Sequence, residues 1–315
     1  MRAHTVLTAL GVASLATLTT AQPKDRINPL IGLLMQKKPV FGLYAPSAGR
    51  GGAPGSTAPV KTAADLAGEA LSYENGDILF SGSMERNFDR GFASFEEFVS
   101  ELAKSPARLK HPLVTKIPKI GDDPAKAVEH ISRQLNLGVS TVVFVDVESA
   151  AEVEQGLRAM RFKSKGGARP DAVGTAPAYW GISEAEYREK ADLWPLNPAG
   201  ELVNWTIVES KEGLARVREI AAVKGIGALF PGAGTLRGVF TTVNQDGQRV
   251  FDEAGWEQAI QQVLAACKEF NVPCGYPATE KDIEMRMKQG FSVFIINWGD
   301  AGFRAVDVGR KVSGR

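Results

Sequence analysis

The chain has 315 residues, of which 44% are hydrophobic and 23% are charged, and these proportions exclude a disordered or collagen-like protein. Its 37 basic and 36 acidic residues leave a net charge of +1, so no overall field attracts nucleic acid or an anionic membrane surface. A nucleic-acid partner is therefore not expected.

Residues 1–21 have the pattern of a secretory signal peptide. Arg2 precedes an apolar run over residues 6–16 that is too short to span a bilayer, and small residues lead up to Ala21. Cleavage after Ala21 predicts a secreted or periplasmic protein, residues 22–315, with no membrane contact once the signal is removed. An uncleaved N-terminal anchor is the alternative.

Eight short apolar runs are predicted to be strands. They are hydrophobic along their whole length, as is typical of strands that are buried on both faces of a sheet. The runs cover residues 40–44, 77–81, 113–117, 141–146, 203–209, 227–230, 273–276 and 292–296.

Helical periodicity separates several of these runs. Asp123 and Ser149 are predicted to cap two of the helices, and Thr279 is predicted to open another. The helical segments are 124–137, 149–160, 211–223, 252–270 and 279–289. Strands that alternate with helices in this way predict an α/β fold, a single (β/α)8 TIM barrel that forms one domain over residues 22–315. A doubly wound open sheet is the alternative.

Two cysteines are present, Cys267 in a predicted helix and Cys274 in the following strand. An exported protein could join them in a disulfide, but this placement favours two buried free thiols. His111 and His130 lack the spacing of a metal site, so structural roles are predicted for both.

Three stretches carry a family resemblance. Residues 135–162 are similar to the pattern LDAGA…vrAtRYPP, residues 208–213 to IETxEG, and residues 219–230 to eIaavpGVdgvfiG. These patterns are typical of the HpcH/HpaI family, the metal-dependent pyruvate aldolases such as 2,4-dihydroxyhept-2-enedioate aldolase, grouped with the citrate lyase β-subunit. The resemblance implies an aldolase-like carbon–carbon lyase that cleaves a hydroxy-keto acid, a small-molecule acid as its ligand, and a homo-oligomer.

The resemblance also implies positions for the site residues. Family members hold a divalent ion, Mg or Mn, with a Glu after strand five and an Asp after strand six; a His after strand two and an Arg after strand three take part in catalysis. Glu209 matches the metal-binding Glu, whereas Gly234 stands at the position of the Asp. Arg86 stands at the position of the His and Lys116 at that of the Arg.

These departures leave the metal site open. A rebuilt site would need further oxygen ligands, which Glu85, Asp146 or Glu148 could supply from neighbouring strand ends. The alternative is that these carboxylates are helix-flanking, strand-end or solvated groups and that the ion has been lost.

Arg86 and Lys116 are predicted to be catalytic, as cations that hold a dicarboxylate or an aromatic acid, and the alternative is that both are paired surface charges. A Schiff-base role for Lys116 is a further alternative. Gly232, Ala233 and Gly234 are predicted to bind the substrate. The competing hypothesis to a lyase is a barrel that has lost its chemistry and binds a small acid or a protein partner.

Overall fold

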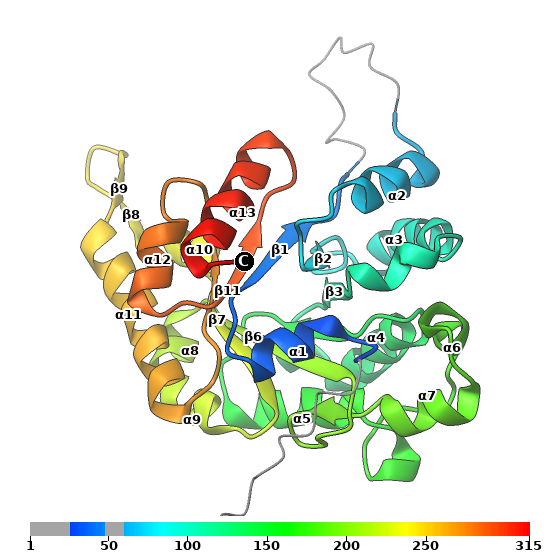
Figure 1. Ribbon diagram of the computed structural model, residues 1–315. Helices are drawn as coiled ribbons and strands as arrows, with labels where there is room; N and C mark the ends of the chain where they lie inside the picture. The colour runs from blue at the N-terminus through cyan, green and yellow to red at the C-terminus, as the bar shows by residue number, and fades with distance from the viewer. Residues whose placement is uncertain (1–25, 48–59) are drawn as a thin grey trace, which may run out of the picture.

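The computed structural model describes residues 26–47 and 60–315 of the chain (Figure 1). The predicted signal peptide, residues 1–21, lies outside the described residues. Within the described ranges, no helix is long and apolar enough to cross a membrane.

All eight predicted strands are found, and they join one parallel sheet. They are β1 (Val40–Tyr44), β2 (Ile78–Ser81), β3 (Leu113–Lys116), β4 (Thr141–Phe144), β6 (Leu202–Val208), β7 (Ile226–Pro231), β10 (Gly275–Pro277) and β11 (Val293–Ile296). A two-residue strand, β5 (Leu193–Trp194), pairs with the start of β6. Strands β8 (Thr241–Val243) and β9 (Arg249–Phe251) form a separate antiparallel hairpin.

The sheet curls but does not close, so the prediction of a closed (β/α)8 TIM barrel is wrong. Its strand order is β10–β11–β1–β2–β3–β4–β6, and β7 also pairs with β6. Strands β7 and β10 meet only at an isolated bridge between Leu229 and Cys274. Strand β10 has three residues, with Pro273 just before this bridge and Pro277 at its end, and a proline has no N–H to donate to a ladder. The order is not doubly wound either, because it follows the chain without a reversal from β1 to β6.

Helices surround the convex face of the sheet (Figure 1). They are α2 (Ala63–Ser72), α3 (Phe88–Leu102), α4 (Pro124–Asn136), α5 (Ala150–Met160), α6 (Ala176–Trp180), α7 (Glu184–Lys190), α8 (Lys211–Ala215), α9 (Val217–Ala222), α10 (Ala233–Val239), α11 (Glu253–Phe270), α12 (Ile283–Gln289) and α13 (Asp300–Ser313). As predicted, the side chains of Asp123 and Ser149 cap α4 and α5 by accepting backbone N–H bonds.

Two of the predicted helices differ in detail. The segment 211–223 is divided at Arg216 into α8 and α9. Helix α12 begins at Ile283 instead of Thr279, because the backbone N–H and the hydroxyl of Thr279 both donate to the carboxylate of Asp282 and form a turn before the helix.

Side chains on each strand alternate between two hydrophobic cores, because successive residues of a strand point to opposite faces. Phe41, Leu79 and Phe144 pack on the convex face against the helices. The concave face carries a second core, whose strand residues include Val40, Ile78, Phe80, Val114, Val143, Val203, Trp205, Ala228, Phe230, Val293 and Ile295.

Helix α1 (Pro29–Met35) covers the amino ends of the strands and closes this concave core (Figure 1). Its buried side chains are Leu30, Ile31 and Leu34. Asn28 caps the helix, and the carboxylate of Glu201, just before β6, accepts the backbone N–H of Asn28 at 3.0 Å. Among residues 26–47 and 60–315, no helix covers the carboxyl ends of the strands in the same way.

Cys267 and Cys274 form a disulfide, so the expectation of free thiols is wrong. Cys267 lies in the last turn of α11, and Asn271 then adopts a left-handed conformation with φ of 52°, which turns the chain back toward the sheet. This turn brings the two Cα atoms to 5.6 Å, within the range of a disulfide. The bond ties α11 to the start of β10.

Candidate active site

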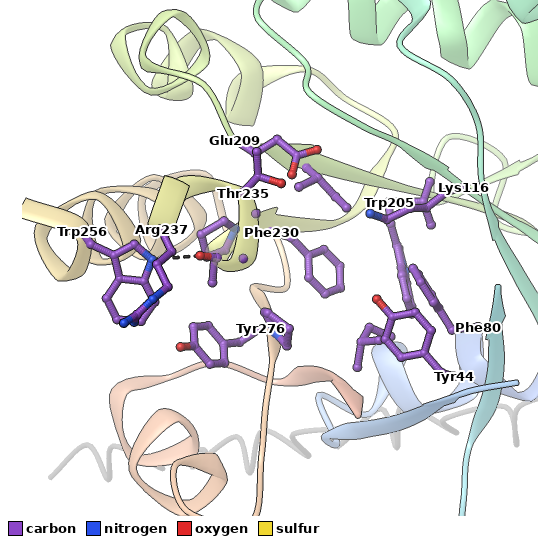
Figure 2. Close-up of a pocket in the computed structure, with 18 residues that line it drawn as sticks. Tyr44, Phe80, Lys116, Trp205, Glu209, Phe230, Thr235, Arg237, Trp256 and Tyr276 are labelled. Atoms are coloured by element: carbon purple, nitrogen blue, oxygen red, sulfur yellow. Dashed lines mark hydrogen bonds between the residues drawn. The ribbon is translucent and has the colours of Figure 1, made fainter. Parts of the chain in front are cut away.

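A cavity of about 390 Å³ lies at the carboxyl ends of the strands, at the opposite end of the concave core from α1 (Figure 2). Tyr44 ends β1, Lys116 ends β3, and Tyr276 is the second residue of β10. All three line the cavity because the carboxyl ends of parallel strands meet at one end of the sheet.

The structure brings together most of the site residues that were predicted from the sequence. Lys116, Glu209 and the segment 232–234 line the same cavity. Glu85 lies beside it, where it contacts Lys116. Arg86 is exposed and is not among the described residues that line the cavity.

Glu209 is the buried carboxylate of this site and is 5% exposed. Its Oε1 accepts the backbone N–H of Asp146 at 3.1 Å. Burial raises the pKa of Glu209 above its usual range, although a hydrogen bond from Thr235 and the charge of Lys116 act in the opposite direction. The carboxyl group is therefore suited to exchange a proton nearer neutral pH than an exposed glutamate.

Gly232 makes room for this carboxylate. A Cβ atom at Gly232 would lie 2.3 Å from Cβ of Glu209 and 2.5 Å from its Oε2, closer than real contacts allow. Gly234 is different, because a Cβ atom there would meet nothing within 4 Å. The glycine at the position of the family's Asp therefore leaves open space beside the site.

Lys116 supplies a positive charge to the cavity. Its Nζ lies 3.0 Å from Oε2 of Glu85, and its side chain is 13% exposed. The Lys116 side chain is thus engaged by a carboxylate, whereas a Schiff-base lysine attacks as the free amine. Tyr44 shares this environment, and burial raises the pKa of its phenol.

The carboxylates of Asp146 and Glu148 form ion pairs with another lysine. Lys119 Nζ lies 2.9 Å from Oδ2 of Asp146 and 2.9 Å from Oε2 of Glu148. Burial lowers the pKa of Lys119, but the two carboxylates outweigh this effect and raise it overall. Asp146 has a positive φ of 47°, the conformation in which its N–H donates to Glu209. This residue thus serves the site through its backbone.

Aromatic rings form much of the cavity wall (Figure 2). The aromatic lining residues are Tyr44, Phe80, Trp205, Phe230, Trp256 and Tyr276. Trp256 donates its indole N–H to the carbonyl of Ala233 at 2.9 Å and so fixes the loop after β7. Trp205 is fully buried, and its indole N–H has no hydrogen-bond partner in residues 26–47 and 60–315. These rings were not among the residues predicted from the sequence, although Tyr44 and Tyr276 could have been found from their positions in predicted strands.

The side chains present do not fit a divalent ion. A hard cation such as Mg²⁺ or Mn²⁺ takes several oxygen ligands, often from more than one carboxylate. Glu209 is the only carboxylate among the described residues that line the cavity. Nowhere in the described part of the chain do three or more His, Cys, Asp or Glu side chains gather as a metal site would require. The candidate ligands Glu85, Asp146 and Glu148 are each paired with a lysine instead.

Comparison with known proteins identifies the family to which the chain belongs. The family model for HpcH/HpaI aldolase/citrate lyase matches residues 98–299. The chain belongs to the HpcH/HpaI aldolase/citrate lyase family. The resemblance in the sequence is thus confirmed, and with it the expectation of an aldolase-like lyase at the level of the family.

Three relatives illustrate the similarity. A hydroxypyruvate/pyruvate aldolase of Paraburkholderia phytofirmans is 26% identical over 213 residues, which cover 66% of this chain and 69% of the relative. An HpcH/HpaI family protein from Burkholderia cenocepacia matches with a TM-score of 0.63 at 22% identity, over 91% of this chain and 96% of its own. The citrate lyase β subunit of M. tuberculosis, solved with oxaloacetate and magnesium, matches with a TM-score of 0.52 at 14% identity, over 88% of this chain and 98% of its own. Both solved structures share their fold with this chain.

Proposed function

We propose that this protein cleaves a carbon–carbon bond of a hydroxy-keto acid by a retro-aldol reaction in the cavity at the carboxyl ends of the strands. The observation that carries the proposal is that a buried carboxylate, Glu209, and an ammonium group, Lys116, face one cavity. Membership of an aldolase and lyase family supports this reaction class, and the pyruvate aldolase relative supports a 2-keto acid as one product.

The geometry suits the proton and charge movements of such a cleavage. Glu209 takes the proton of the hydroxyl group at C4 of the substrate, the bond between C3 and C4 breaks, and C4 leaves as an aldehyde. The electron pair moves to the keto oxygen at C2, and the resulting enolate is stabilised by the Lys116 ammonium. A proton then returns to C3 and gives the keto acid.

The walls of the cavity indicate which chemical group the substrate carries beyond its hydroxy-keto acid part. Phe80, Phe230 and Trp256 present ring surfaces, so an apolar or aromatic group on the leaving aldehyde would bury its surface against them. Arg237, also in the lining, adds a second cation at the mouth. These features support a small organic acid with an apolar remainder.

The test is a retro-aldol assay of the purified protein on aliphatic and aryl 4-hydroxy-2-keto acids, with the released pyruvate measured by a coupled enzyme. We expect Lys116→Gln to lower kcat/KM by about 100-fold or more, because it removes the charge that meets the enolate. Lys104→Gln is the matched control, since the Lys104 side chain is 70% exposed and pairs with Glu101 at the end of α3, away from the cavity lining. Binding of keto acids without any turnover would support the alternative of a protein that keeps the fold but has lost its chemistry.

Arg86 and the assembly state belong to the same proposal. Arg86 follows β2 on the catalytic end of the sheet, and its predicted role in catalysis is tested by Arg86→Gln in the same assay. A homo-oligomer, which the family resemblance implies, is tested by light scattering of the purified protein.

A further inference from the structure

We propose that this site holds its keto acid without a divalent ion, and that the Lys116 ammonium and the Trp205 indole N–H together bind the anionic oxygens. The inference rests on the proposed function for the ligand class. It departs from the metal chemistry that the family resemblance implies.

The first step is the missing ligand set. Gly234 supplies no oxygen from its side chain, and Glu209 is left as a lone carboxylate among the described lining residues. Lys116 and Arg237 line the same cavity, Lys116 as the partner of Glu85 beside it and Arg237 with its guanidinium over the ring of Phe251. A divalent ion that entered the cavity would meet one carboxylate in the described lining, Glu209, and would be repelled by both lining cations.

The second step is an unsatisfied donor. Trp205 is 0% exposed and lines the cavity, and its Nε1 lacks a hydrogen-bond partner within the described ranges. A buried N–H without a partner is unfavourable, so such donors are rare and require an explanation. An oxygen atom of a bound ligand would satisfy it.

The third step is the register of three neighbouring strands. Lys116 of β3 is paired with Val143 of β4, and Val143 is paired with Trp205 of β6. Paired residues of parallel strands point to the same face, so Lys116 and Trp205 lie on either side of Val143 in one row. Figure 2 shows Lys116 and Trp205 on the same side of the cavity. The proposal sets the carboxylate and the keto oxygen of the ligand between these two strands, with Lys116 and Trp205 as the donors.

The experiment measures binding and does not depend on turnover. Pyruvate is titrated by calorimetry into the full chain in the presence of EDTA, and then with Mn²⁺ or Mg²⁺ added. We expect the same Kd in both conditions, and a Kd at least about tenfold weaker in Lys116→Gln and in Trp205→Phe. Trp205→Phe keeps an aromatic ring and removes the N–H, and circular dichroism checks that both variants are folded.

Three results would overturn the inference: pyruvate binding that requires a metal, Trp205→Phe binding as tightly as the parent, or no binding under either condition. Gly234→Asp is the positive control for metal affinity, because it adds the family's second carboxylate in open space. We expect it to gain measurable Mn²⁺ binding that the parent lacks. Turnover that needs Mn²⁺ would refute this inference and leave the proposed function standing. Metal-free binding of pyruvate without turnover would support this inference and refute the proposed function.

Discussion

Gly232 and Gly238 lie at the two ends of α10, and only Gly232 packs against Glu209. Gly232→Ala would push a methyl group into Glu209, so we expect kcat/KM for keto-acid cleavage to fall by about 100-fold, as it does when a reacting group is misplaced by about 1 Å. Gly238→Ala is the matched control, since Gly238 lies in α10 outside the cavity lining and a Cβ atom there meets nothing within 4 Å, so activity should be kept while stability rises by roughly 0.5–1 kcal/mol. Steady-state kinetics and thermal unfolding of the two variants decide the point. Equal losses of activity would contradict it.

Single residues of the site differ in how well the sequence could predict them. Lys116 and Glu209 were predictable, because each follows an apolar strand in a fold whose chemistry gathers at strand ends. Trp205 was not, because every residue of β6 is buried and such a strand carries no alternation to show which side chains face the cavity. The lysine partners of Asp146 and Glu148 were equally hidden, since ion pairing depends on loop conformation.

At the scale of elements, α1 is held to the start of β6 by Glu201. Burial raises the pKa of Glu201, although the N–H of Asn28 and the charge of Arg26 lower it. The folded state therefore binds this proton more tightly than the unfolded state, whose pKa is about 4.3. It follows that this contribution to stability is complete below the unfolded pKa and is lost as the pH rises through the folded pKa.

Glu201→Gln removes this titration, and its pH profile is the prediction. Between about pH 4 and pH 7 we expect the free energy of unfolding of the parent to decline relative to that of the variant, by no more than about 1.4 kcal/mol per pH unit. Urea unfolding of both proteins across this range measures the difference. Two parallel profiles would contradict the raised pKa, whatever the offset between them.

The disulfide between Cys267 and Cys274 acts on a second element, the edge strand β10. Replacing both cysteines by alanine removes a constraint on the unfolded chain and should cost about 2 kcal/mol of stability. Tyr276 lies on β10 two residues after Cys274, so KM for the keto acid should rise as well. Treating the parent with a reductant should reproduce both effects, and an unchanged melting temperature in the double variant would count against this role.

The elements themselves were well predicted where hydrophobicity decides them. All eight strands followed from their apolar runs, because both faces of the sheet are buried. The closure of the sheet was not predictable. It requires a ladder of hydrogen bonds between β7 and β10, which depends on the register of the two strands and on the N–H donors available in β10. The disulfide was missed for a related reason, because the turn at Asn271 is a tertiary feature.

For the whole molecule, the sequence predicts export. We expect protein isolated from its native host to begin near Gln22, because residues 1–21 have the charge, apolar run and small residues of a signal peptide. N-terminal sequencing measures this directly. Recovery of an intact Met1 from a cytoplasmic fraction would contradict it.

The concave core also has a thermodynamic consequence. Helix α1 completes this core at the amino ends of the strands, whereas at the other end its aromatic side chains border the cavity. A ligand that enters the cavity supplies the missing layer of packing, and the apolar surface it covers should give binding a negative change in heat capacity. Calorimetry at several temperatures would measure this change for an aliphatic and for an aryl keto acid. The difference between the two would report how much more apolar surface of the cavity the aryl group covers.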